Sequence, residues 1–110
     1  MKNIENVVDV LWQHITEIAT VTEWANKMEY SSTDYFSRKF RNHYGIRPKE
    51  VLIKKRLDKI RACLRESPDD IYYSIARKMG FVDSTSLYKF VNWHTGKSIT
   101  DLKMESENGV

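Results

Sequence analysis

The sequence contains the same 22-residue pattern twice, at residues 24–45 and 75–96. A shift of 51 residues aligns the two segments without a gap, and it gives five identities, which lie at Ala25, Lys27, Met28, His43 and Gly45 of the first segment. Each segment predicts a short helix, a turn and a second helix that ends at a glycine. Solenoid proteins need three or more copies of their repeat, so two copies separated by a long helix favour two helix-turn-helix units.

The spacing of the apolar residues predicts an all-α fold of about seven helices, with no segment of strand period. Thr20 and Glu23 form a capping box, Ser32 and Asp83 are candidate N-caps, and Gly96 ends the last helix of the second repeat. A turn at residues 67–70 separates the two halves. The predicted organisation is an N-terminal helix with the first unit at 1–47, a linker helix at 48–66, the second unit with a closing helix at 67–104, and a frayed tail at 105–110.

Positive charge is concentrated in the middle of the chain. Residues 31–65 contain eleven Lys or Arg and three Asp or Glu, whereas residues 1–30 and 66–110 each carry a net negative charge. A local positive block of this kind predicts a polyanionic partner, although a solvated helix surface is the simpler alternative.

The outward face of each predicted second helix carries polar or cationic side chains. On the helix at 32–44, Asp34, Ser37, Arg38 and Arg41 share one face at i, i+3, i+4 and i+7. On the helix at 83–95, the equivalent residues are Thr85, Tyr88, Lys89 and Asn92. Such side chains donate to and accept from base edges in the major groove of DNA, but they are also compatible with a solvated face.

The length of the linker helix sets the expected distance between these two faces. A helix of about 19 residues spans about 28 Å. With the bodies of the two units added, the second helices would lie on the order of 34 Å apart, which is one turn of B-DNA. We therefore expect both helices to enter successive major grooves of one duplex.

The two units and the linker also carry a set of residues that together resemble a known family. They are Ala25, the segment SxxYFSRKF at 32–40, Gly45, Arg56, Leu64, Ile75, Ala76, Gly80, Phe81, Leu87 and the segment HTG at 94–96. From residue 4 to residue 104 the chain resembles the DNA-binding domain of the AraC/XylS family of bacterial transcription regulators. Val91, Ile99 and the pair Leu102-Lys103 depart from the family pattern, which usually has Phe, Pro and Tyr-Arg there.

The resemblance implies that the second helix of each unit reads bases. By position, the base-reading residues would be Asp34, Ser37, Arg38, Ser84, Thr85, Tyr88 and Lys89. We predict phosphate contacts from Ser32, Thr33, Arg41, Lys49, Lys54 and Asn92. Because the second reading helix carries a single Lys or Arg, we expect the first unit to dominate affinity.

The resemblance also implies a regulator that binds double-stranded DNA in the cytoplasm, contacts RNA polymerase and activates transcription. We expect a monomer that takes no cofactor, spans no membrane and contains no small-molecule effector domain. The missing effector domain leaves two alternatives open, a stand-alone regulator and a piece of a longer one.

An enzyme or a metalloprotein is not indicated, and no catalytic or metal-ligating residue is predicted. The three histidines are far apart in the sequence, and Cys63 is expected to be a buried core thiol. The remaining alternative is a protein-interaction module of the same fold that reads no DNA and docks on RNA polymerase or another regulator.

Overall fold

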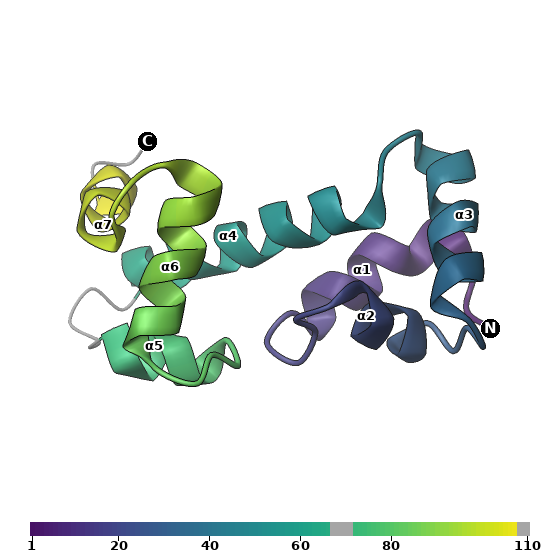
Figure 1. Cartoon of the computed structure of the whole chain (residues 1–110), viewed down its shortest axis with the longest axis horizontal. Helices are drawn as coiled ribbons and strands as arrows, with labels where there is room; N and C mark the ends of the chain where they lie inside the picture. Colours follow the sequence, from purple (N-terminus) through teal and green to yellow (C-terminus); the bar gives the residue numbers. More distant parts are fainter. Residues whose placement is uncertain (67–71, 108–110) are drawn as a thin grey trace. The chain divides into compact units, whose positions relative to one another are not determined.

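The computed structural model of the chain describes residues 1–66 and 72–107, and it confirms the all-α prediction. Within these residues the chain forms seven α-helices, one 3₁₀ turn and no strand. The elements of Figure 1 are η1 (Ile4–Asn6), α1 (Val7–Gln13), α2 (Val21–Lys27), α3 (Thr33–Tyr44), α4 (Pro48–Glu66), α5 (Tyr72–Lys78), α6 (Ser84–Thr95) and α7 (Ile99–Glu107). The turn predicted at 67–70 lies outside the described residues. None of the helices described is long and apolar enough to cross a bilayer.

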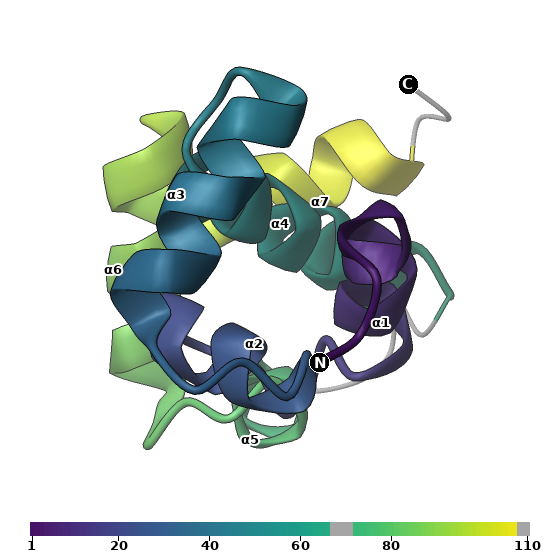
Figure 2. The same ribbon diagram turned by 90° about the vertical axis from the view of Figure 1, so that its right-hand side faces the viewer.

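The chain divides into two compact units, Met1–Arg56 and Leu57–Val110, and the division falls inside α4. The first unit is built around Trp24 of α2, whose ring meets the rings of Phe36 and Phe40 edge-on at centroid distances of 5.5 and 5.3 Å. The Trp24 indole N–H donates to the carbonyl of Val7 at 3.1 Å. One buried side chain of α2 therefore contacts both α1 and α3. Figure 2 shows the ribbons of these three helices.

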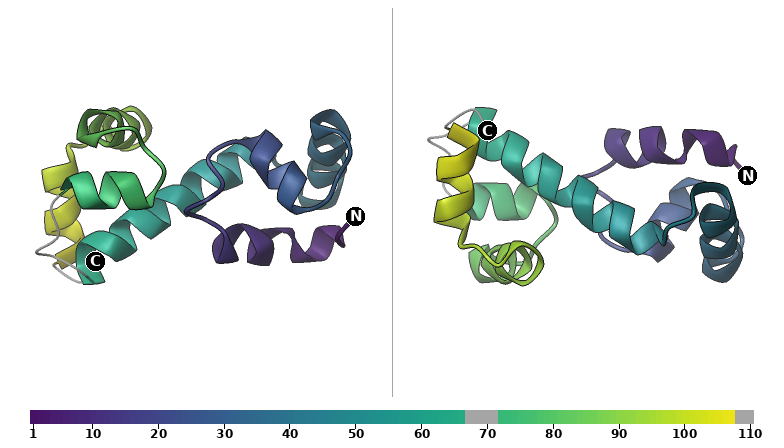
Figure 3. Two further views of the ribbon diagram at one scale, coloured as in Figure 1. Left: turned by 90° about the horizontal axis from the view of Figure 1, so that it is seen from below. Right: turned by 90° about the horizontal axis from the view of Figure 1, so that it is seen from above.

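The second unit has a separate hydrophobic core. In Figure 3, α5, α6 and α7 gather around the C-terminal half of α4. The buried side chains of this core are Ile60, Cys63, Leu64, Ile75, Ala76, Met79, Leu87, Val91, Ile99 and Leu102. Cys63 is a buried free thiol, as the sequence predicts.

The backbone hydrogen bonds repeat with the 51-residue shift. Tyr30 N–H donates to the Ala25 carbonyl at 3.0 Å, and Phe81 N–H donates to the Ala76 carbonyl at 2.8 Å. Gly45 N–H and Gly96 N–H close α3 and α6 through the same bond, at 2.8 and 2.9 Å. Both glycines adopt the left-handed conformation, with φ of 76° and 72°, which ends each helix as predicted.

The turn between the two helices of each unit also needs a left-handed residue. In the second unit this residue is Gly80, with φ of 85°, and in the first it is Glu29, with φ of 63°. A residue with a Cβ is sterically strained in this conformation, whereas glycine is not. The two turns therefore share one backbone geometry, and only one of them has the residue best suited to it.

The C-terminal helix is longer than the sequence predicts. A closing helix that ends near Met104 and a frayed tail from residue 105 were expected, but α7 continues to Glu107. Two contacts explain the difference: Lys97 Nζ pairs with Glu105 Oε1 at 2.8 Å, and the buried Ser106 hydroxyl donates to the Leu102 carbonyl at 3.0 Å. The prediction of a frayed tail is therefore wrong for residues 105–107, while residues 108–110 lie outside the described part.

Candidate DNA-binding surface

Helix α3 is fixed at both ends and along its inner side. Ser32 is the N-cap, and its hydroxyl oxygen accepts from the Tyr35 N–H at 3.2 Å. Phe36 and Phe40 are fully buried, so one side of α3 faces the core, while Asp34, Arg38 and Arg41 lie on the exposed side. The predicted reading face of α3 is thus set by the packing of the helix.

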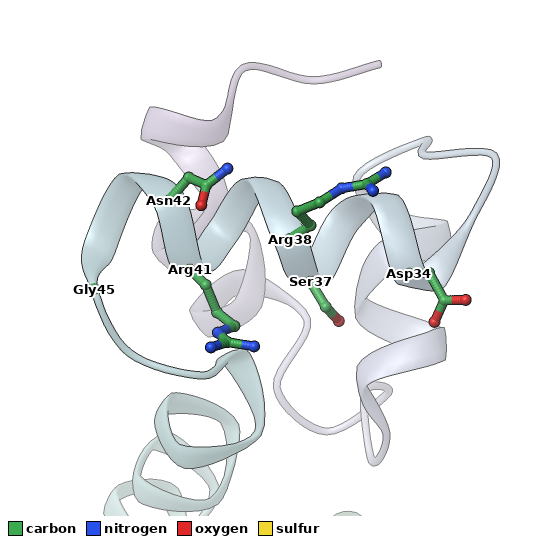
Figure 4. A pocket seen from close by; sticks show the side chains of 6 residues that line it. All are labelled: Asp34, Ser37, Arg38, Arg41, Asn42 and Gly45. Carbon is green, nitrogen blue, oxygen red and sulfur yellow. The ribbon is translucent and has the colours of Figure 1, made fainter.

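The outward face of α3 borders a surface hollow of about 510 Å³. The hollow is lined by Asp34, Ser37, Arg38, Arg41, Asn42 and Gly45. In Figure 4 these side chains project from successive turns of α3, and Arg41 extends toward the segment that follows Gly45. Two exposed guanidinium groups on one helix face can donate to phosphates or, in bidentate fashion, to guanine.

A second hollow of about 250 Å³ adjoins the same face. It is lined by Val21, Thr33, Ser37, Arg41, Arg47, Pro48 and Lys49. Ser37 and Arg41 border both hollows. The structure thus brings six predicted residues to two neighbouring hollows of the first unit: Thr33, Asp34, Ser37, Arg38, Arg41 and Lys49.

Two other predicted residues of the first unit lie outside the linings of these hollows. Lys54 is exposed on α4, and Ser32 lies at the N-terminus of α3, where its oxygen is already engaged as the cap. Not every cation of the positive block is at the surface either. Arg56 is only 6% exposed, and burial lowers its pKa below the ordinary value. Arg56 therefore belongs to the packing of the first unit.

Tyr35 supports the charged side chains of α3. Its ring lies 5.9 Å from the Arg38 guanidinium and 6.0 Å from the Lys39 ammonium, distances that allow a cation–π attraction. The ring of Tyr30 packs against Tyr35 at 5.7 Å. Asp34 lies in the first turn of α3, where its negative charge is favourable next to the helix dipole.

Helix α6 is positioned in the same way but presents different chemistry. Asp83 is its N-cap and accepts from the Ser86 N–H at 2.8 Å, and hydrogen bonds from the backbone and side chain of Ser86 lower the pKa of Asp83. Leu87 and Val91 are fully buried. The predicted residues Thr85, Tyr88, Lys89 and Asn92 are exposed, and Ser84 is half-buried.

The family of the chain follows from its sequence. Residues 24–104 match the model of a protein family described as a helix-turn-helix domain, which covers both units. The chain belongs to the AraC/XylS-type helix-turn-helix family of DNA-binding transcription regulators. The resemblance inferred from the residues is thereby confirmed, and the two outward faces lie on the second helix of each helix-turn-helix unit.

A solved structure of similar fold is the DNA-binding domain of AdpA, a global transcriptional factor, crystallised in complex with a target DNA. The match has a TM-score of 0.75 at 23% sequence identity and covers 98% of this chain and 96% of that one. At this identity the likeness concerns the fold. No curated protein matches the sequence.

Two residues of the surface were missed by the sequence reasoning. Asn42 lies one position beyond Arg41 and shares its face, because i+8 continues the stripe of i, i+3, i+4 and i+7. Arg47 reaches the second hollow from the loop before α4, and the high density of cations around it was the available signal. Among the described residues, no group of three or more His, Cys, Asp or Glu is arranged to hold a metal ion.

Proposed function

We propose that this protein is a bacterial transcription regulator that binds double-stranded DNA sequence-specifically in the cytoplasm and inserts α3 and α6 into successive major grooves. The observation that carries the proposal is the outward face of α3, where Arg38 and Arg41 are exposed beside a hollow. This helix is the second helix of a helix-turn-helix unit in a chain that belongs to a family of DNA-binding regulators. The AdpA domain, which has a similar fold, was crystallised with a target DNA, and this supports the proposal.

The residues of the first unit divide by reach and chemistry. Arg38, with Asp34 and Ser37, lies near the start and middle of α3 and reads bases, because a guanidinium can donate two bonds to one guanine. Arg41, Lys49 and Lys54 contact phosphates, together with the hydroxyl groups at the start of the helix, Ser32 and Thr33. In the second unit, Ser84, Thr85, Tyr88 and Lys89 read bases, and Asn92 contacts phosphate.

The experiment that tests this proposal is selection from a random pool. Duplexes with a random core of about 25 base pairs, enough for two grooves one turn apart, are titrated with the protein at two salt concentrations, and the retained fraction is sequenced. Two enriched blocks one helical turn apart are expected. Salt-sensitive retention without a motif would leave a non-specific binder. The absence of retention at low salt would refute DNA binding and favour the protein-interaction module.

Arg38 provides the sharpest test of base reading. Replacing Arg38 by Ala should weaken binding to the selected site by about 1–3 kcal/mol and relax the choice at one base pair, because a bidentate contact is lost. Binding to a random duplex of the same length should change much less. An equal loss on both duplexes would show that Arg38 contacts only the backbone.

Activation through RNA polymerase is the finer part of the proposal, and membership of the family supports it. We expect the protein to act as a monomer, since one chain carries two reading helices. Single-round transcription from a promoter that carries the selected site, with and without the protein, measures the sign of regulation. Sedimentation with a labelled duplex measures the number of chains bound to each site.

A further inference from the structure

The face of α6 can be assigned residue by residue from the face of α3. Each helix has twelve residues between its N-cap and a left-handed glycine, and the two are related by the 51-residue shift. The five α3 residues that line the larger hollow are Asp34, Ser37, Arg38, Arg41 and Asn42. Their counterparts on α6 are Thr85, Tyr88, Lys89, Asn92 and Trp93. Trp93 therefore belongs to the reading face of α6.

Trp93 is also the most exposed large apolar side chain that the structure describes, with 83% of its surface accessible. It lies in the last turn of α6, which is closed by the bond from Gly96 N–H to the Asn92 carbonyl at 2.9 Å. Exposing an indole to water is unfavourable, and its position on the helix gives it no part in the core. A large apolar group held on a recognition face is expected to have a partner there.

The two faces differ in the chemistry that they offer. The α3 face carries two guanidinium groups, whereas the α6 face carries one ammonium group and two aromatic rings. Tyr88, 39% exposed, is held in place by the ring of Tyr72, which it meets edge-on at 5.9 Å. Lys89 is one helical turn before Trp93, so a cationic side chain that can donate to a base lies next to the exposed indole.

The apolar group that a duplex presents in its major groove is the C5-methyl group of thymine. We propose that α6 recognises a thymine-containing half-site through contacts of Trp93 and Tyr88 with these methyl groups, while α3 recognises its half-site by hydrogen bonds from Arg38. This inference rests on the proposed function, in which α6 enters the groove. The inference takes DNA as the partner of the face that carries Tyr88 and Trp93. A protein partner for that face is the alternative that the test can reveal.

The test uses the duplex obtained by selection from the random pool. The block whose selection relaxes in the Arg38→Ala variant is assigned to α3, and the other block is assigned to α6. Each thymine of the α6 block is then replaced by deoxyuridine, which keeps the hydrogen-bonding groups and lacks the methyl group. We expect binding to weaken about fourfold for each contacted methyl group, the value for burial of one such group. The same replacement in the α3 block is the matched duplex control.

Trp93→Ala should bind the thymine duplex more weakly than the wild-type protein does. Its deoxyuridine effect should be smaller by the share that Trp93 supplies, because Tyr88 still contacts its own methyl groups. Because Trp93 is exposed, this variant should melt at the wild-type temperature. Met104→Ala, which removes an apolar side chain 57% exposed on α7 outside the reading face, is the matched protein control and should keep the full sensitivity to deoxyuridine.

Three results would overturn the inference while leaving the proposed function intact. They are an α6 block without thymine, a deoxyuridine effect that is as large in Trp93→Ala as in the wild-type protein, and unchanged affinity of Trp93→Ala for the thymine duplex. The last result would assign Trp93 to a protein partner instead. A wild-type protein that selects no sequence at all would refute the proposed function itself, so the two failures are distinguishable.

Discussion

The replacement of Glu29 by Gly tests the internal repeat through stability. Glu29 has φ of 63°, and its N–H donates to the Asn26 carbonyl at 3.0 Å, as Gly80 N–H donates to the Arg77 carbonyl at 3.1 Å. A left-handed residue with a Cβ costs about 1–2 kcal/mol, which glycine removes. The greater freedom of glycine in the unfolded chain offsets about 0.4–1 kcal/mol of this gain. We expect Glu29→Gly to stabilise the first unit by about 0.5–1 kcal/mol.

The side chain of Glu29 contributes little to set against this gain. Its pair with Lys2 is 3.8 Å long, and the two side chains are 59% and 46% exposed, so the pair contributes close to nothing. In a domain of this size the gain raises the melting temperature by about 2–8 °C. Circular dichroism at the helix band, in heat and in urea, measures the shift.

Glu29→Ala is the matched control, because it removes the carboxylate and keeps the Cβ. Gly80→Ala is the reverse change and should destabilise the second unit by about 1 kcal/mol or more, because alanine is strained at this φ. If Glu29→Gly melts at or below the temperature of Glu29→Ala, relief of the left-handed strain contributes nothing and the prediction is wrong.

Two further predictions concern charge. Single replacements of Arg41, Lys49 and Lys54 by Ala should each make the fall of log affinity with log salt less steep by about 0.9. The loss of affinity should be equal on the specific and the random duplex. Unchanged slopes would contradict the phosphate contacts. The lowered pKa of Asp83, ordinarily 3.8, means that its cap stabilises α6 fully above that value and weakens as pH falls through the lower folded value. Urea midpoints should therefore fall more steeply in acid for the wild-type protein than for Asp83→Asn, and parallel curves would refute the assignment.

The features that the sequence predicts correctly are those set by neighbouring residues. Ser32 and Asp83 cap their helices because a short oxygen-bearing side chain reaches an N–H group two or three positions along the chain. Gly45 and Gly96 end the helices because glycine tolerates the left-handed conformation. These local rules predict the first and last residues of α3 and α6 to within one residue.

Features that depend on contacts between segments could not be predicted in the same way. The extension of α7 goes with the burial of Ser106 and the pair between Lys97 and Glu105, and no local rule distinguishes these residues from solvated ones. The left-handed Glu29 follows from the turn geometry that it shares with Gly80, and glutamate gives no local sign of it. The repeat did contain this information, because residue 29 aligns with a glycine, but only the structure shows that the backbone is shared.

The buried residues of the two repeats are alike in chemistry, whereas the exposed residues of the second helices differ. The buried positions of the two repeats stay apolar after a shift of 51 residues, because both units need the same helix packing. The five aligned positions of the outward faces share no identical residue. The α3 face has two guanidinium groups, whereas the α6 face has two aromatic rings. On the proposed function, two such faces bind two different half-sites. A single chain that binds unlike half-sites lies on DNA in one direction only, whereas a symmetric dimer on a palindrome has no direction. On the proposed function, this fixed direction means that the orientation of the site decides which face of the chain is turned toward a polymerase bound on one side.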